Sequence, residues 1–283
     1  MSNSRKKKFL ILAFRFILSL LACSFLVIFI FTPLLAVFSN AFQKGVSFYL
    51  EMLKREETIS ALTLTLGILI IVLPLNVIFG VACAWYVTKY QFRGKRFLVA
   101  LLDLPFTLSP VVAGTMLVLL YSVNGVLGWV VESLGMKIIF AFPGLVIATL
   151  FVTFPFIARE LIPVMEEQGS EMEEAGRMLG ASGRHIFFRI TLPNIKWGLF
   201  YGVVLCVARC VGEFGAVSVV SGHIRGKTIT LPLEIEILYN EYNLVGAFCL
   251  ATVLCGTGLL SLILRKWIES SEKVSKRRYF FGD

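Results

Sequence analysis

Two oppositely charged residues, Arg209 and Glu213, stand four apart in an otherwise apolar stretch, VLCVARCVGEFGAVSVVSG. At that spacing two side chains share one face of a helix and can form an ion pair. Ionisable residues within a membrane are costly and usually face the interior of a helix bundle or a watery cavity. We therefore expect either a structural ion pair that fixes helix packing or a charged gate or cavity wall. Because Glu213 would neutralise Arg209, the pair offers little net charge to an anion.

Two of the six cysteines, Cys206 and Cys210, are also four residues apart, a spacing that could place two thiols on one metal ion. No histidine lies near them in the sequence, since His185 and His223 fall in expected loops. A buried free cysteine commonly packs as a small apolar side chain. We therefore expect core packing here and no metal site. All six cysteines fall in apolar segments, so no disulfide framework is expected.

A polar segment, residues 166–196, separates two apolar segments and reads EAGRMLGASGRHIFFRITLP from Glu174 to Pro193. Just before that stretch, Ser170 and Glu173 have the spacing of a capping box, in which each side chain bonds the other residue's backbone N–H. This spacing predicts a short helix that begins at Ser170.

The residues after this helix favour a turn and a second short helix. Gly180 suits the left-handed backbone that ends a helix. Ser182 can cap the next helix, and Pro193 is expected to end it. Two helices around a glycine form a compact projection that could enter a cleft in a partner protein. The alternative is an amphipathic hairpin on the membrane surface, with Phe187 and Phe188 in lipid.

Composition indicates a helical membrane protein that must position these residues. The 283 residues are 57% hydrophobic and only 16% charged, and their mean hydropathy is +0.83. Soluble domains are about 45–50% apolar. The apolar runs are unbroken and far longer than the alternating segments of a membrane β-barrel. We expect about six transmembrane helices, each longer than the ~20 residues that cross a bilayer. The expected segments are 10–38, 59–88, 97–122, 141–164, 197–221 and 244–266.

The formal net charge of +9 is unevenly distributed. Most lysines and arginines cluster before the first segment, between the second and third, within 166–196, and at the C-terminus. By the positive-inside rule these parts are cytoplasmic, which gives cytoplasmic tails at 1–9 and 267–283. The apolar run from Phe9 to Phe38 is too long for a signal peptide and indicates a retained first helix. No basic patch is interleaved with aromatic residues, so nucleic-acid binding is not expected.

Prolines interrupt the third and fourth segments, at positions 105, 110, 143, 155 and 163. Broken helices at membrane depth are tolerated where they are buried in protein or line a watery cavity. The breaks therefore predict either simple kinks for packing or a translocation path lined partly by opened backbone. The candidate path or gate residues are Thr107, Ser109, Thr153, Arg209, Glu213 and Ser218. Small residues at 208, 212 and 216 would let a neighbouring helix approach closely.

The polar segment resembles the loop by which permeases of ABC importers engage their ATPases. That loop reads Glu-Ala-Ala, three residues, Gly, nine residues, Ile-x-Leu-Pro. The matching ATPase-coupling residues in this chain are Glu174, Ala175, Gly180, Ile190, Leu192 and Pro193. Only Gly176 departs, where the pattern has Ala. This change is expected to leave docking intact and to loosen the helix.

Longer stretches, among them LPFTLSPVVAGTM and ARCVGEFGAVSVVSGHIRGKTITLPLEIEILYNEYN, resemble the W-type permease subunits of sulfate/thiosulfate ABC transporters. The resemblance covers about residues 60–250. It implies a single all-α transmembrane domain over 1–283 with the type I ABC importer permease fold, multi-pass in a bacterial inner membrane with both termini cytoplasmic.

The same resemblance implies a non-enzymatic subunit that imports sulfate, and thiosulfate with it. Its partners would be a sister permease of the T type in a heterodimer, a dimeric cytoplasmic ATPase, and an extracytoplasmic sulfate-binding protein. The chain would bind no cofactor, because ATP and Mg would belong to the ATPase. Consistent with that, the sequence has no Gly-x-x-x-x-Gly-Lys-Ser/Thr phosphate loop.

Three other functions remain open at this point. A molybdate or tungstate ABC permease is the nearest, because those dianions resemble sulfate in shape. An ion-coupled secondary carrier would give the coupling loop no role, and the six segments show no inverted repeat. A membrane scaffold without transport would leave the broken helices and intramembrane charges unexplained.

Overall fold

A computed structural model describes the backbone of residues 2–135 and 137–281, with the side chains of 2–13, 130, 134 and 268–281 left aside. The basic N-terminal run and most of the basic C-terminal tail, which support the expected orientation, lie outside the described side chains. Over the described residues the chain is helical with no strand. The all-α fold predicted from composition is confirmed.

The elements follow the chain in a simple order, in which η1 and η2 are single π-helical turns. They are α1 (Ser2–Leu26), η1 (Val27–Phe31), α2 (Thr32–Ala41), α3 (Gly45–Lys54), α4 (Glu56–Lys89), α5 (Lys95–Thr107), α6 (Pro110–Tyr121), α7 (Gly128–Leu134), α8 (Phe142–Thr153), α9 (Pro155–Gln168), α10 (Glu171–Met178), α11 (Gly183–Ile186), η2 (Phe187–Thr191), α12 (Leu192–Val211), α13 (Gly215–Ser221), α14 (Leu231–Asn240) and α15 (Leu244–Phe281).

Five helical segments are long and apolar enough to cross a membrane. They are Phe14–Ala41, Glu56–Lys89, Phe142–Gln168, Gly183–Val211 and Leu244–Trp267. A sixth candidate is the pair α5 and α6, which bends by 107° just before Pro110. Six apolar segments were expected, and the break in the third falls at one of the prolines that predicted it.

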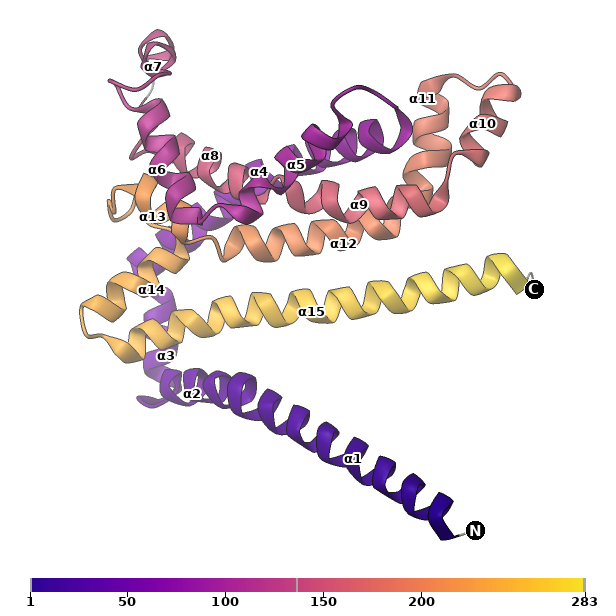
Figure 1. The fold of residues 1–283 in the computed structure, drawn as a ribbon. Helices are drawn as coiled ribbons and strands as arrows, with labels where there is room; N and C mark the ends of the chain where they lie inside the picture. Colours follow the sequence, from indigo (N-terminus) through magenta and orange to yellow (C-terminus); the bar gives the residue numbers. More distant parts are fainter. Residues whose placement is uncertain (1, 136, 282–283) are drawn as a thin grey trace.

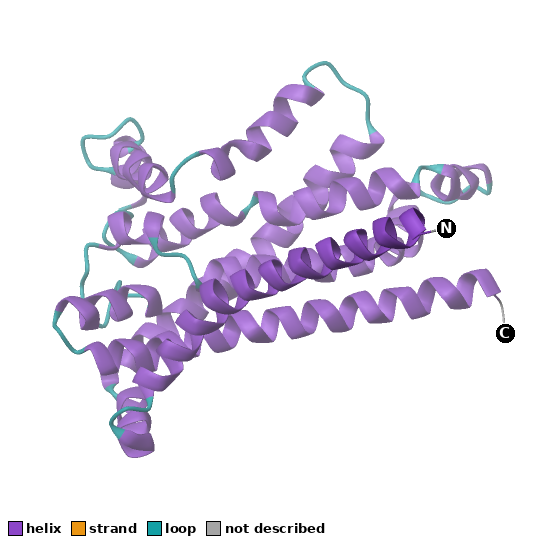
Figure 2. Ribbon diagram, turned by 60° about the horizontal axis from the view of Figure 1, so that its bottom comes forward, coloured by secondary structure: helices purple, strands orange, loops and turns teal. Residues whose placement is uncertain are grey.

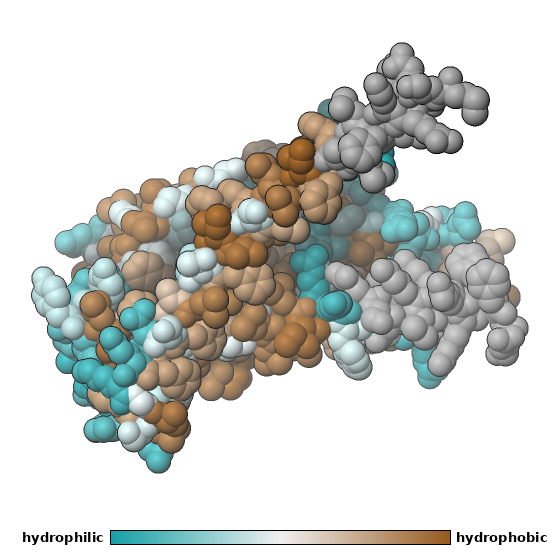
Figure 3. Space-filling view, turned by 90° about the horizontal axis from the view of Figure 1, so that it is seen from below, coloured by the Kyte–Doolittle hydropathy of each residue, from teal (hydrophilic) through white to brown (hydrophobic). Residues whose placement is uncertain are grey.

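The polar ends of the molecule lie on opposite sides of an apolar middle. Figures 1 and 2 place both chain termini and the α10–α11 hairpin at one end of the helix bundle. The α2–α3 turn, α7 and the α13–α14 loop lie at the other end (Figure 1). Seen from below, apolar side chains form a broad central band between polar ends (Figure 3). This arrangement suits a bundle that crosses a bilayer.

The expectation of one continuous helix over 197–221 is wrong. α12 ends at Val211, the backbone is non-helical over 212–214, and α13 begins anew at Gly215. The cause is local, because glycines at 212 and 215 disfavour helix and the Glu213 carboxylate accepts a hydrogen bond from the Ala216 N–H at 2.9 Å. The small residues at 208, 212 and 216 therefore do not lie along one helix.

The prediction that Pro193 ends the second helix of the polar segment is wrong. α11, η2 and α12 form one continuous helical segment, Gly183–Val211. A proline within a helix removes one hydrogen bond and clashes with the carbonyl four residues earlier. Here Pro193 stands in the first turn of α12, directly after the π-helical turn of η2, where the altered bonding pattern accommodates the ring.

The main core lies where α4, α8, α9 and α12 pack together, with Val72, Leu145, Leu161 and Ile195 fully buried. α4 and α9 approach closely at Gly80, where an added Cβ would lie 2.7 Å from the Ile157 side chain. A second cluster joins α2, α3, α14 and α15. The two cores hold the helices that carry the polar hairpin and the helix breaks.

Candidate functional site

The α10–α11 hairpin projects from the end of the bundle that carries the termini (Figure 1). Its turn depends on Gly180, whose φ of +82° lies in the left-handed region that glycine adopts without strain, as predicted. The hydroxyl of Ser182 then accepts a hydrogen bond from the His185 N–H at 3.4 Å, so the predicted cap is present. At the tip, Met178 and Leu179 are 90% and 89% exposed. Two apolar side chains so exposed on a polar projection indicate a contact surface.

The predicted capping box does not form. The Ser170 hydroxyl donates to the Glu174 carboxylate at 2.6 Å instead of capping the backbone. Glu173 is drawn away from the start of the helix because it has a stronger, charged partner elsewhere. The helix α10 nevertheless begins where the spacing placed it.

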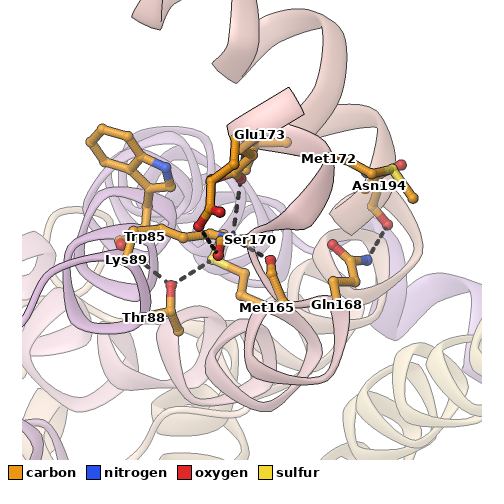
Figure 4. Close-up of polar contacts among 12 residues, drawn as sticks. Trp85, Thr88, Lys89, Met165, Gln168, Ser170, Met172, Glu173 and Asn194 are labelled. Carbon is orange, nitrogen blue, oxygen red and sulfur yellow. Dashed lines mark hydrogen bonds and ion pairs between the residues drawn. The ribbon is translucent and has the colours of Figure 1, made fainter. Parts of the chain in front are cut away.

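A buried polar junction joins the base of the hairpin to the bundle, and Figure 4 shows Lys89 and Glu173 at its centre. Oε1 of Glu173 lies 3.2 Å from Nζ of Lys89 and accepts a hydrogen bond from the Thr191 hydroxyl at 2.7 Å. Lys89 also donates to the carbonyl of Gly169 at 2.6 Å. The side chains of Lys89 and Glu173 are only 11% and 9% exposed. One carboxylate oxygen thus connects α4, α10 and η2.

The remaining coupling residues divide into exposed and packed groups. Glu174 and Ala175 are exposed on α10, where a partner could reach them. Gly176 faces the second arm, because a Cβ there would lie 2.9 Å from Cδ1 of Ile190. Leu192 is half-buried and Pro193 is exposed at the start of α12. Gly176 therefore permits close packing of the two arms, which sequence reasoning treated only as a loss of helix propensity.

Two of the helix breaks, between α5 and α6 and between α12 and α13, lie against each other. A Cβ on Gly215 would lie 2.8 Å from the Pro110 side chain, and one on Gly114 would lie 2.7 Å from the carbonyl oxygen of Ala216. The α5–α6 break is thus packed against the α12–α13 break. Thr107 and Ser109 are exposed at the first of these breaks.

Two of the candidate path residues, Thr107 and Ser218, use their hydroxyls to bond the backbone of their own helices. Thr107 donates to the Leu104 carbonyl at 2.9 Å, and Ser218 donates to the Gly215 carbonyl at 2.9 Å. Each hydroxyl oxygen keeps free lone pairs but has already given its proton. These two side chains therefore stabilise the broken backbone more directly than they line a path.

Arg209 and Glu213 form the predicted ion pair, with Nη1 of Arg209 2.6 Å from Oε2 of Glu213. Oε2 of Glu213 has no hydrogen-bond partner, so this contact is primarily electrostatic. The shared helix face used to predict it is wrong, since Glu213 lies in the break after α12. The Glu213 side chain is 1% exposed and that of Arg209 is 30% exposed. The pair therefore closes the gap between α12 and α13 and leaves Arg209 partly accessible.

A second buried polar group lies beside this pair, inside the bundle. The Asn76 amide donates to the Thr153 hydroxyl at 2.8 Å and to the Cys206 sulfur at 3.3 Å. Cys206 and Cys210 are free thiols whose sulfurs are 3.9 Å apart, and both are buried. Among the described residues no group of three potential metal ligands occurs. The cluster links α4, α8 and α12.

Sequence reasoning missed Lys89, Thr191 and Asn76. Asn76 carried a usable signal, because a lone amide in a long apolar run must find a buried partner. In the sequence, Lys89 is one of several basic residues at a membrane boundary, and Thr191 occupies the variable position between Ile190 and Leu192 of the coupling pattern. Their roles depend on tertiary contacts. Elsewhere, Nη1 of Arg159 in α9 lies 3.3 Å from Oδ1 of Asp103 in α5.

Comparison with known proteins places the chain among transport components. The family model described as "binding-protein-dependent transport system inner membrane component" matches residues 76–274. A Synechocystis sp. protein named sulfate transport system permease protein CysW is 49% identical over 255 residues, covering 90% of this chain and 92% of that protein. A Salmonella typhimurium protein named sulfate transport system permease protein CysT is 34% identical over 246 residues, covering 87% and 89%.

A solved structure shares the fold at low sequence identity. A chain of a bacterial alginate ABC transporter, crystallised in complex with an alginate pentasaccharide-bound periplasmic protein, superposes with a TM-score of 0.74. The match covers 96% of each chain at 16% identity. At that identity the likeness establishes the fold of an ABC importer permease and nothing about the transported molecule.

Proposed function

The chain belongs to the family of binding-protein-dependent transport system inner membrane components, and on that premise we propose that it is the membrane-spanning permease subunit of an ATP-driven ABC importer for sulfate. The names of its relatives support sulfate as the transported anion. We extend the proposal to thiosulfate. It is a membrane component without catalytic residues of its own.

The observation that carries this function is the exposed tip of the α10–α11 hairpin. Met178 and Leu179 are 90% and 89% exposed, and the hairpin lies at the end of the bundle that also carries both termini (Figures 1 and 2). A dimeric cytoplasmic ATPase that holds ATP and Mg would receive this tip together with Glu174 and Ala175. Both termini lie at the same end of the bundle as the hairpin that would meet this ATPase, which supports a cytoplasmic location for both termini.

The rest of the importer follows from the same proposal. A sister permease of the T type would complete the path as a heterodimer, and an extracytoplasmic binding protein would deliver the anion at the opposite end. Closure of the ATPase dimer would move the hairpins and rock the helix bundles against each other. Sulfate would then enter between the subunits, past the helix breaks.

The test is reconstitution of the whole importer in vesicles. With sister permease, ATPase and binding protein present, radiolabelled sulfate uptake should require ATP, and this chain alone should give none. Competition by unlabelled thiosulfate and molybdate would define the anion range. Saturable uptake by this chain alone, driven by an ion gradient, would refute the proposal in favour of a secondary carrier.

The hairpin contact has its own matched experiment. The double substitution Met178→Asp and Leu179→Asp should abolish co-purification of the ATPase, because it replaces the apolar tip with charge. Val126→Asp is the control, since Val126 is 77% exposed and lies just before α7 in the chain, which lies at the opposite end of the bundle (Figure 1). Equal ATPase recovery with the two hairpin substitutions and with the control would show that the tip is not the contact.

A further inference from the structure

We propose that the buried Lys89–Glu173 pair transmits the motion of the hairpin to α4, so that Lys89 and Glu173 are positioning residues for transport. This inference rests on the proposed function and concerns a step inside it. It assigns a role to a contact between residues far apart in the sequence, neither of which belongs to the pattern that marks the coupling loop.

The geometry makes Glu173 the junction of three elements. Its Oε1 atom is within 3.2 Å of Nζ of Lys89, the last residue of α4, and within 2.7 Å of the hydroxyl of Thr191, the last residue of η2. Both charged side chains are about nine-tenths buried. A charge pair in such surroundings is screened much less than one at the surface. The hairpin therefore cannot shift without pulling on α4.

Besides this pair, the hairpin touches α4 through an apolar contact, in which the rings of Trp85 and Phe187 lie edge to face with centroids 5.9 Å apart. The turn between α9 and α10 contains Gly169, whose φ of +67° is in the region that glycine alone adopts easily. Lys89 pins this turn as well, through its 2.6 Å bond to the Gly169 carbonyl. Gln168 bonds the Asn194 carbonyl at 2.7 Å, which ties the turn to α12 but not to α4. Lys89 is thus the charged link between α4 and the hairpin.

α4 connects this junction to the helix breaks. Asn76 lies in the same helix, about 20 Å from Lys89 at 1.5 Å per residue, and bonds Thr153 at the end of α8 and Cys206 in α12. Displacement of the Lys89 end of α4 would therefore act on the residues around the breaks. If Lys89 were unlinked, the ATPase could still dock and hydrolyse ATP, but less of its motion would reach the path.

The local surroundings make single variants practical. A cavity of about 440 Å³ adjoins the pair and is lined in part by Lys95, Glu174 and Arg177. Water in that cavity can solvate Lys89 when its partner is removed. We therefore expect variants at either position to fold and assemble, which lets transmission be measured separately from stability.

The experiment compares sulfate uptake per ATP hydrolysed in the reconstituted importer. Glu173→Gln, Lys89→Met and the double variant should each lower this ratio at least fivefold, while ATPase recovery and ATP hydrolysis stay within twofold of the unmodified protein. Lys89→Arg keeps the charge and should retain at least half of the ratio. Glu57→Gln, which breaks the exposed 3.5 Å pair with Arg55, is the control and should leave the ratio unchanged.

The outcomes separate transmission from a merely structural role. Recovery of the full ratio in the double variant would mean that only the unpaired charge was harmful, and would overturn the proposal. Unchanged ratios in the single variants, or loss of the ATPase from the complex, would overturn it too. As a second measurement, the rate of amide hydrogen exchange over residues 171–178 should rise in Glu173→Gln, in Lys89→Met and in the double variant. If the unmodified importer takes up no sulfate with ATP, the proposed function itself has failed.

Discussion

The Arg209–Glu213 pair allows a prediction whose direction depends on burial. Replacing Arg209 with Gln leaves the Glu213 carboxylate, 1% exposed, with the Ala216 N–H as its remaining partner. Replacing Glu213 with Gln leaves Arg209, 30% exposed, which can turn towards water. We therefore expect Arg209→Gln to be the more damaging single change, and the double variant to recover part of the loss.

The magnitude follows from the cost of an unpaired buried charge. Breaking one side of a buried pair typically costs about 3–5 kcal/mol, whereas removing both partners is often near neutral. We assign about 3 kcal/mol to Arg209→Gln and, because of its partial exposure, about 1–2 kcal/mol to Glu213→Gln. At ~2 °C per kcal/mol for a chain of this size, apparent melting temperatures should fall by roughly 6 °C and 3 °C.

The assay is thermal unfolding of the detergent-purified importer, with the four proteins of the double-variant cycle measured at one scan rate. A constant scan rate matters because membrane complexes unfold irreversibly. Additive losses in the double variant would show that the two residues do not interact. A larger loss for Glu213→Gln than for Arg209→Gln would refute the burial argument. Reduced sulfate affinity in Arg209→Gln with unchanged stability would instead make Arg209 an anion site.

Three further outcomes follow from local geometry. Gly180→Val should strain the left-handed turn by ~1 kcal/mol and reduce ATPase co-purification, whereas Gly183→Val, equally open but without positive φ, should not. Gly114→Ala should lower the melting temperature by overpacking worth ~1–3 kcal/mol, while Gly67→Ala, 3.8 Å from its neighbour, should not. Burial raises the pKa of the Glu234 carboxyl above its ordinary 4.5, so the folded state holds the carboxyl proton more tightly than the unfolded state does. The folded state therefore loses stability as pH rises above 4.5. Glu234→Gln should raise the melting temperature at neutral pH, and this gain should vanish in acid.

Features that depend on local backbone chemistry could be predicted from the sequence. Gly180 was placed correctly because a left-handed residue must follow a helix that turns back, and Ser182 because a hydroxyl can satisfy a free N–H. The break before Pro110 follows equally from the missing donor of proline. Apolar run lengths located the candidate spans closely, except that the expected segment 197–221 is broken at 212–214.

Features that depend on competing tertiary partners could not be predicted. The spacing of Glu173 predicts a capping residue, but Lys89 and Thr191 offer its carboxylate a buried charge and a hydroxyl. Pro193 predicts a helix end, because the π-helical turn that accommodates its ring leaves no mark in the sequence. Arg209 and Glu213 were paired correctly for the wrong reason, since helix periodicity does not reveal the break at 212–214.

The helical segment from Gly183 to Val211 joins the second arm of the hairpin to a membrane span without a break, although Figure 1 shows α11 turned steeply away from the axis of α12. α12 itself, Leu192–Val211, is roughly 30 Å long at 1.5 Å per residue, and it ends next to the break that holds Glu213. A tilt of only about 5° at the hairpin end of α12 would sweep the far end of such a lever through roughly 3 Å, by the same helix length. A slight rotation at one face of the bundle is therefore amplified into an ångström-scale displacement of the break at the other.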